Sequence, residues 1–208
     1  MTSPTVADLR SHPPVADPVA RFNALLDDAR AIDPGRLPEP TAFALGTVSA
    51  SGQPSVRMLL IKHADDDGFV FFTNFDSRKG QELSATGKAA LCFHWQPLEV
   101  QVRIEGGVER VSDAESDAYF ATRARGSQIG AWASRQSQPI SHPDELERRV
   151  AEFEAKFKDR RVPRPAHWGG FRLIPEAIEF WKNMPNRLHV RHRYVREGST
   201  WRVETLYP

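Results

Sequence analysis

The sequence predicts a mostly β protein, a small antiparallel barrel with helices on its outside. Segments with strand-like patterning follow one another closely between residues 42 and 111, separated by short stretches that contain glycine or proline. Segments with helical spacing are few and do not alternate regularly with these strands. A parallel sheet would need that alternation, so the pattern favours the antiparallel barrel.

Composition is typical of a folded globular chain. The 208 residues are enough for one sizeable domain, with 40% apolar and 26% charged residues. The formal net charge of +1 excludes a global basic field of the kind that binds nucleic acid. Any anion-binding site must therefore be local.

Targeting features are absent from the pattern. No apolar run approaches the roughly 20 residues of a membrane span, and residues 1–18 lack the hydrophobic stretch of a secretory signal. The single Cys92 lies in an apolar segment, so we interpret it as a core residue that suits a reducing compartment. These features predict a cytoplasmic protein without membrane or nucleic-acid partners.

The first structured element is predicted to be a helix that starts at residue 18. Residues 1–16 are rich in Pro and Ser and are expected to form a flexible segment ahead of a single domain, residues 17–208. Asp17 suits an N-cap, with Pro18 at the first helical position, and the Pro- and Gly-containing stretch 33–40 ends the helix. Its predicted core-facing stripe consists of Val19, Phe22, Leu26 and Ala29.

Strands are predicted next. Residues 42–74 read as three strands joined by turns at 50–53 and 65–68. Residues 88–111 continue with strands broken at Gln96-Pro97 and at Gly106-Gly107. Strand patterning returns in three later segments, 171–181, 188–196 and 201–208.

Two helices are predicted between these groups of strands. Ser112 and Glu115 form a capping box ahead of the first helix, and Ser141 with Asp144 forms a weaker box ahead of the second. The residues of the second helix that are expected to face the core are Leu146, Val150, Phe153 and Phe157.

The first candidate anion-binding segment is "VRMLLIKH", residues 56–63. Arg57 and Lys62 bracket an apolar run that reads as one strand. Their positions have opposite parity, so without a bulge their side chains leave opposite faces of the sheet. One strand could then serve two anionic groups; the alternative is that both residues mark strand ends in solvent.

The second candidate is "TNFDSRKGQEL", residues 73–83. Ser77 is predicted to cap a short helix with Arg78, Lys79 and Gly80 in its first turn. Cations are disfavoured at a helix N-terminus by the helix dipole. Two of them are explained if an anion such as a phosphate binds among those amides.

The third candidate is residues 121–141, which are rich in hydroxyl and amide donors. This segment either forms a solvated loop or a second anion site, with donors from Arg123, Arg125, Ser127, Gln136 and Ser137. Together with the rings of Tyr119 and Trp181, two such sites would suit a phosphorylated aromatic cofactor and a phosphorylated substrate.

Other chemistries are not supported. His189 and His192 have HxxH spacing, but on an extended segment they cannot share a face, and no metal site is predicted. Neither a specific serine triad nor a glycine-rich nucleotide fingerprint can be found.

Seven ordered motifs resemble the pyridoxine/pyridoxamine 5′-phosphate oxidase family from about residue 40 to the C-terminus. They are "RMLLIKH", "FFTNFDSRKGQEL", "FHWQPLEVQVRIEG", "SQIGAWASRQSQPI", "HWGGFRL", "IEFW" and the spaced pattern RLH.R..Y. The resemblance implies a split β-barrel, a Greek-key-like antiparallel barrel that binds flavin mononucleotide (FMN). It also implies a homodimer with two flavin sites at its interface. The implied reaction converts pyridoxine or pyridoxamine 5′-phosphate to pyridoxal 5′-phosphate, with O₂ reduced to H₂O₂.

Site residues follow from the same resemblance, position by position. Arg187 and His189 are implied as catalytic residues over the pyridine ring, on the face away from the flavin, so the cation-rich segment 180–196 would be an active-site wall. The substrate is implied to contact Lys62, Tyr119, Arg123, Ser127, Arg187, Leu188 and His189. FMN is implied to contact Arg57, Met58, Leu59, Leu60, Ile61, Lys62, Phe72, Thr73, Arg78, Lys79, Gln101, Gln136, Ser137, Trp181 and Arg191.

Two departures from the family pattern leave alternatives open. Arg10 lacks the tyrosine of the usual N-terminal lid motif, and Val190 stands where the tail often has aspartate. The alternatives are a related FMN oxidase of another planar ring, as in phenazine biosynthesis, and a non-catalytic protein that binds flavin or pyridoxal phosphate. The preference between alcohol and amine substrates is not determined by the sequence.

Overall fold

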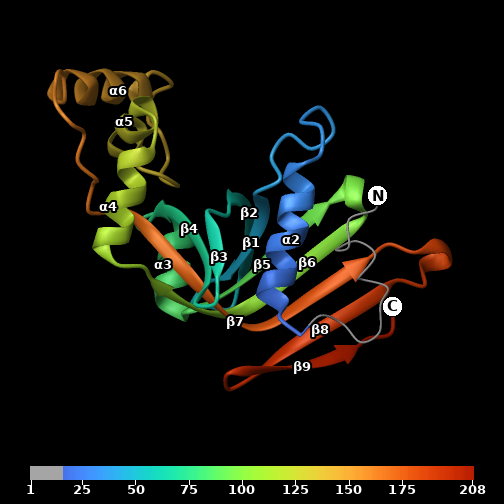
Figure 1. Cartoon of the computed structure of the whole chain (residues 1–208). Coiled ribbons are helices and arrows are strands. Elements are labelled where there is room, and N and C mark those ends of the chain that lie inside the picture. Colours follow the sequence, from blue (N-terminus) through green and yellow to red (C-terminus); the bar gives the residue numbers. More distant parts are fainter. Residues whose placement is uncertain (1–15) are drawn as a thin grey trace.

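One antiparallel sheet of nine strands runs through residues 16–208, the part of the chain that the computed structural model describes (Figure 1). Its main path is β2-β1-β5-β6-β7-β4-β3, with β8 paired to β7 and β9 to β8. The strands are β1 (Ala42–Val48), β2 (Pro54–Leu60), β3 (His63–Asp65), β4 (Gly68–Asn74), β5 (Lys88–Trp95), β6 (Val100–Arg110), β7 (Trp168–Lys182), β8 (Val190–Glu197) and β9 (Thr200–Thr205). The predicted flexible segment and the lid residue Arg10 lie outside the described residues, except for Ala16.

Strand β7 divides the sheet. The first part of one edge, Trp168 to Leu173, pairs with β4, and the last part, Ala177 to Lys182, pairs with β8. The other edge pairs with β6 along almost the whole strand. The sheet therefore curls towards β4 at one end of β7 and continues into β8 and β9 at the other, which confirms the predicted antiparallel split-barrel fold.

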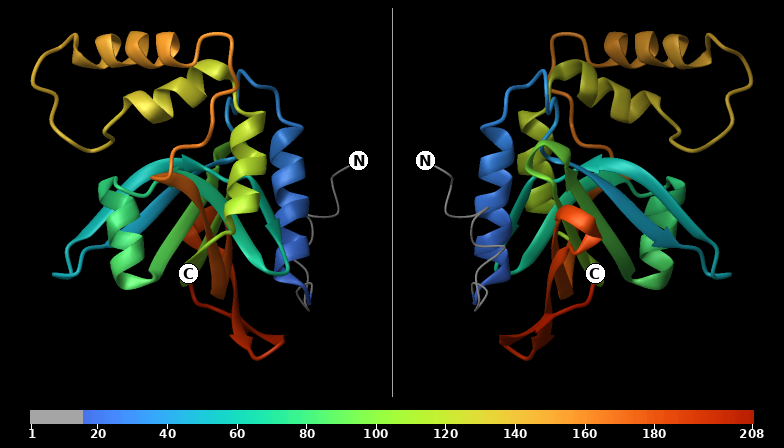
Figure 2. Two further views of the ribbon diagram at one scale, coloured as in Figure 1. Left: turned by 90° about the vertical axis from the view of Figure 1, so that its left-hand side faces the viewer. Right: turned by 90° about the vertical axis from the view of Figure 1, so that its right-hand side faces the viewer.

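Helix α2 (Pro18–Arg30) packs against the concave face of the sheet (Figures 1 and 2). The Asp17 side chain accepts hydrogen bonds from the amides of Val19 and Ala20, which confirms the predicted N-cap. Phe22 is fully buried, with its ring centroid 5.0 Å from that of Phe69 and 4.9 Å from that of Phe93, in edge-on contacts. The predicted apolar stripe of this helix is buried.

Three helices form an arm at one end of the sheet: α4 (Asp113–Thr122), α5 (Arg125–Ala133) and α6 (Glu145–Lys156) (Figures 1 and 2). They surround a second hydrophobic cluster that includes Phe120, Ile129 and Trp168. Ser112 caps α4 by accepting from the Glu115 amide, as predicted. No helix within residues 16–208 is long and apolar enough to cross a membrane.

Helix α3 (Arg78–Thr86) joins β4 to β5 and begins as the sequence predicted. The Ser77 hydroxyl accepts from the Gly80 amide at 3.3 Å, and the helix ends at Gly87, which has a left-handed φ of 63°. Gly80 must be glycine, because a Cβ there would collide with the carbonyl oxygens of Asn74 and Phe75.

Two strand predictions were wrong. Arg57 and Lys62 do not share a strand, because β2 ends at Leu60 and the next side chain, Ile61, turns into the core. The Lys62 amide then donates to Val70 of β4, so the chain has changed its pairing partner between the two cations. The predicted break at Gly106-Gly107 is a β-bulge inside one continuous strand, β6.

Helix α6 begins where it was predicted, but its predicted capping box was wrong. The helix starts at Glu145, and the side chain of its N-cap residue, Asp144, makes no capping hydrogen bond. Leu146 is 41% exposed, because it lies beside the loop of residues 134–140 rather than over the hydrophobic cluster. Val150, Phe153 and Phe157 do pack into the cluster, as predicted.

Candidate cofactor and substrate site

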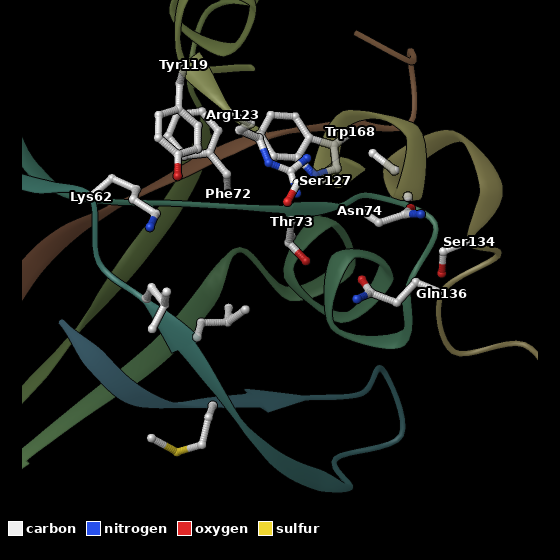
Figure 3. Close-up of a pocket in the computed structure, with 15 residues that line it drawn as sticks. Lys62, Phe72, Thr73, Asn74, Tyr119, Arg123, Ser127, Ser134, Gln136 and Trp168 are labelled. Carbon is white, nitrogen blue, oxygen red and sulfur yellow. The ribbon is translucent and has the colours of Figure 1, made fainter. Parts of the chain in front are cut away.

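A pocket of about 600 Å³ opens between the sheet and the helical arm (Figure 3). Figure 3 shows Lys62 and Tyr119 at one end of this pocket and Ser134 and Gln136 at the other. The predicted site residues that line it are Met58, Leu59, Leu60, Lys62, Phe72, Thr73, Tyr119, Arg123, Ser127 and Gln136. Its other lining residues are Asn74, Gly130, Ala131, Ser134 and Trp168.

A cluster of cations borders the pocket at the start of α3. Arg57 of β2 and Arg78 of α3 both reach Glu82, whose side-chain oxygens lie 3.3 Å and 2.8 Å from their guanidinium nitrogens. Glu82 is 5% exposed and also accepts from the Thr47 hydroxyl. Burial raises the pKa of Glu82, but the hydrogen bonds from Thr47 and Arg78 and the two positive charges outweigh it, and the pKa lies below its ordinary value.

Lys79 is the cation of this cluster that lacks an acidic partner. It is 8% exposed, and within residues 16–208 its Nζ contacts only neutral oxygens, Ser77 Oγ at 3.3 Å and Gln136 Oε1 at 3.1 Å. Burial, and then the charge of Arg57, hold the pKa of Lys79 below its ordinary value. Two cations thus share the carboxylate of Glu82, while Lys79 keeps an uncompensated charge that suits a phosphate.

Aromatic rings form the opposite wall of the pocket. The rings of Phe72 and Tyr119 stack with centroids 4.1 Å apart, and Phe72 also stacks on Trp168 at 5.4 Å. Lys62 Nζ lies 5.6 Å from the Tyr119 ring centroid. This wall brings β4, α4 and β7 together at one side of the pocket.

Arg123 follows α4 and faces the same pocket. Its guanidinium lies 4.6 Å from the Trp168 ring centroid, and its buried Nη1 has no hydrogen-bond partner within residues 16–208. Burial lowers the pKa of Arg123, with a smaller opposing contribution from Tyr119. A buried donor without a partner costs about 1–3 kcal/mol, so this nitrogen is suited to receive an anionic oxygen.

The remaining predicted flavin ligands lie elsewhere. Gln101, Trp181 and Arg191 form one cross-strand row on β6, β7 and β8. Arg191 makes two hydrogen bonds to Glu179, at 2.8 and 3.1 Å, and these raise its pKa. None of the three lines the pocket described above.

The predicted catalytic residues lie beside this row, in the connection from β7 to β8. Asn186 and Arg187 both have left-handed φ values, 58° and 60°, in the short 3₁₀ helix η2 (Pro185–Arg187). His189 is fixed: its ring is 4.6 Å from that of Trp181, and its Nδ1 accepts from the Met184 amide at 3.2 Å. The ring proton of the neutral imidazole is therefore on Nε2. Leu188 is 68% exposed.

Distance along β7 separates the two groups. Trp168 starts the strand beside the pocket, and Trp181 lies 13 residues later on the same strand. At about 3.3 Å per residue this is roughly 40 Å of strand. Figure 1 shows the arm and the β7–β8 connection at opposite sides of the molecule. We call the pocket with the α3 cations the first half-site and the row with the β7–β8 connection the second half-site.

Several predicted flavin ligands of the first half-site do not line the pocket. Arg57 and Arg78 do not line the pocket and form ion pairs with Glu82. Ser137 lies in the adjoining loop with a left-handed φ of 73°, and Ile61 faces the core. Sequence reasoning missed Glu82 and Trp168. The spacing of Arg78 and Glu82, four residues apart on a helix, was a usable signal for the first. For Trp168 there was only its place in the "HWGGFRL" motif.

Two family models match most of the chain. The model described as pyridoxamine 5′-phosphate oxidase matches residues 34–157. The model described as pyridoxine 5′-phosphate oxidase C-terminal dimerisation region matches residues 168–208. The second match includes the whole of the second half-site except Gln101.

Similar curated proteins carry the same description. The pyridoxine/pyridoxamine 5′-phosphate oxidase of Myxococcus xanthus strain DK1622 is 55% identical over 195 residues, covering 92% of this chain and 92% of its own. The protein of that name from Bordetella pertussis strain Tohama I is 55% identical over 194 residues, covering 93% and 90%.

Two solved structures resemble the fold. PhzG from Burkholderia lata 383, in complex with tetrahydrophenazine-1-carboxylic acid, superposes with a TM-score of 0.84 at 33% identity, covering 99% of this chain and 96% of its own. A pyridoxamine 5′-phosphate oxidase-related, FMN-binding protein from Nostoc punctiforme gives 0.71 at 16% identity, covering 93% and 100%. The second likeness concerns the fold alone, a split barrel.

Proposed function

Because the chain belongs to the pyridoxine/pyridoxamine 5′-phosphate oxidase family, we propose that it oxidises pyridoxine or pyridoxamine 5′-phosphate to pyridoxal 5′-phosphate, with FMN as cofactor and O₂ as acceptor. One observation carries the proposal: the first half-site holds two separate cationic centres, at Lys79 and at Arg123, and no carboxylate within residues 16–208 pairs with either. A phosphorylated cofactor and a phosphorylated substrate would each supply one anion.

The residues present fit the phosphate of FMN. Lys79 is buried and repelled by Arg57, so an anion at this point would compensate both charges. Gln136 already contacts Lys79 and lines the pocket, which connects the cation cluster to the space for a flavin ring. When bound, FMN supplies the two-electron acceptor, and the protein supplies orientation and charge.

The substrate is expected to lie against the aromatic wall. Arg123, Lys62, Tyr119 and Ser127 would hold its phosphate, and they all line the pocket. Arg187 and His189 would cover the pyridine ring from the other side. With Nδ1 of His189 accepting from the Met184 amide, its Nε2 would donate a hydrogen bond to the substituent at the reacting carbon and hold that group in position.

Because the two half-sites lie at opposite ends of β7, we infer that Arg187 and His189 would reach that position from a second copy of the chain. We therefore include a homodimer in the proposal, consistent with the match of residues 168–208 to a dimerisation region. A two-fold interface would form two equivalent sites. Light scattering is expected to give twice the chain mass of 23.4 kDa. An active, flavin-saturated monomer would contradict this part of the proposal.

Oxygen consumption tests the reaction. The purified, FMN-loaded protein should consume O₂ and release equimolar H₂O₂ when given pyridoxine 5′-phosphate or pyridoxamine 5′-phosphate. A protein that binds FMN tightly but consumes no O₂ with either compound would instead be a binding protein. A colourless protein that cannot be reconstituted with FMN would end the proposal.

A second candidate is an oxidase of another planar ring. The specific observation in its favour is the similarity to PhzG across 99% of the chain at 33% identity. Tetrahydrophenazine-1-carboxylic acid, the compound in that complex, should be assayed beside the two phosphorylated substrates. It carries a carboxylate instead of a phosphate and so offers fewer acceptor oxygens and less charge to Arg123, and we expect the phosphorylated compounds to be oxidised much faster.

A further inference from the structure

Trp168 is held rigidly in the wall of the pocket. Its side chain is 7% exposed, and its indole is stacked on Phe72 with an interplanar angle of 10° and edge-on to Phe120 at 5.1 Å. It begins β7, where pairing with Asn74 of β4 fixes the backbone. The indole therefore presents a fixed face to the pocket (Figure 3).

Arg123 lies over that face. Its guanidinium carbon is 4.6 Å from the Trp168 ring centroid and 5.6 Å from the Phe120 centroid. Within residues 16–208 the Arg123 side chain forms neither an ion pair nor a hydrogen bond, and its Nη1 is buried. Aromatic faces are its principal contacts.

Another arginine under the same arm is held differently. Arg164 has its Nη2 2.6 Å from Asp113 and its Nε 2.6 Å from Asp117, and these two carboxylates raise its pKa. Carboxylates use up the N–H donors of a guanidinium and neutralise its charge. An aromatic ring contacts the face of the guanidinium, so the donors at its edge stay available.

We propose that Trp168 is a positioning residue for phosphate recognition, because it fixes Arg123 through a cation–π contact while leaving the guanidinium edge for a phosphate monoester. This rests on the proposed function, in which the pocket accepts a phosphorylated substrate. The role is separate from binding of the flavin phosphate, because Lys79 adjoins the pocket through Gln136, at the end away from Lys62 and Tyr119 (Figure 3).

The test compares Trp168→Phe and Trp168→Leu with the wild-type FMN-loaded protein. Indole is the strongest cation–π partner and leucine offers none, so KM for pyridoxine 5′-phosphate should rise about two- to threefold in Trp168→Phe and about tenfold or more in Trp168→Leu. The kcat and the flavin content should stay within about twofold of the wild type, because a phosphate handle binds ground and transition states alike. Unphosphorylated pyridoxine should show no such graded change in kcat/KM.

Trp132→Leu is a matched control. Trp132 packs against the same hydrophobic cluster and has a lysine, Lys156, 5.4 Å from its ring, but it does not line the pocket. It should lower thermal stability without changing KM. If Trp132→Leu raises KM as much as Trp168→Leu, or if the two Trp168 variants have the same KM as the wild type, the inference is wrong. If Trp168→Leu does not fold, the comparison of KM between Trp168→Phe and the wild type is sufficient to test the inference.

Binding of 4-deoxypyridoxine 5′-phosphate, which cannot be oxidised, separates this inference from the proposed function. Calorimetry should show the same graded loss of affinity in the two variants. A graded loss in a protein that oxidises nothing would support the inference and refute the function. Normal oxidation of the phosphorylated substrates, together with the same binding affinity in the wild type and both variants, would support the function and refute the inference.

Discussion

Arg187→Ala is expected to lower kcat/KM for pyridoxine 5′-phosphate about tenfold or more, while the protein keeps its flavin. A tenfold loss corresponds to about 1.4 kcal/mol of transition-state stabilisation. Arg187 is exposed and forms no ion pair or hydrogen bond within residues 16–208, so the folded chain does not use its charge. Its left-handed φ of 60° is a strained conformation that suggests a functional position.

Related variants make this result specific. Arg187→Lys should restore little, because a point charge replaces a planar fork that can cover a ring. His189→Asn should have a smaller effect if the imidazole only positions the substrate, and a pH-dependent one if it moves a proton. Arg196→Ala removes an exposed arginine of β8, which lies over Trp201, and should change neither kcat/KM nor the flavin content. Loss of flavin from Arg187→Ala with normal substrate affinity would contradict our assignment of the two half-sites.

Lys79→Met should weaken FMN binding about tenfold to a hundredfold, the equivalent of about 1.5–3 kcal/mol for a charge-assisted hydrogen bond. The same substitution should leave the stability of the flavin-free protein unchanged or slightly higher. Lys79 is desolvated and repelled by Arg57 and has only neutral partners, so its removal relieves a cost in the absence of phosphate. Fluorescence titration with FMN and thermal unfolding of the flavin-free protein measure the two effects.

The opposite signs of these effects distinguish a binding residue from a structural one. Arg78→Ala should weaken FMN binding less than Lys79→Met, because Glu82 holds Arg78 at 2.8 Å and already compensates part of its charge. Lys156→Met, on the distant face of the arm, is the control and should not change FMN affinity. A flavin-free Lys79→Met protein that is markedly less stable but binds FMN normally would show that Lys79 is a packing residue.

Much of the fold could be predicted because its signals are local. The caps at Asp17, Ser77 and Ser112 and most strands follow from short patterns of polar and apolar residues. The errors occurred where a distant partner decides the local structure. Gly106 lies inside β6, where a Cβ would collide with the Ile174 carbonyl oxygen, so this glycine marks a close approach of two strands and not a turn. Ile61 turns inward because the chain changes pairing from β1 to β4.

The candidate site could be predicted only in part for the same reason. Family motifs identified the residues of both half-sites, but not their separation, which depends on the course of β7. The pair of Arg78 and Glu82 lies on one helix and was accessible to spacing rules. The contacts of Arg57 with Glu82 and of Arg123 with Trp168 join residues that are 25 and 45 positions apart in the sequence. Helix and strand periodicity predicts neither contact.

In the proposed dimer, the separation of the two half-sites along β7 determines whether two mutant alleles can complement each other. One allele could damage the pocket end, for example at Arg123, and another the far end, at Arg187. In a mixed dimer both lesions would fall in the same site, and the other site would be assembled from two undamaged halves. Two inactive gene products could then complement each other in one cell, whereas two alleles with lesions at the same end of the strand could not.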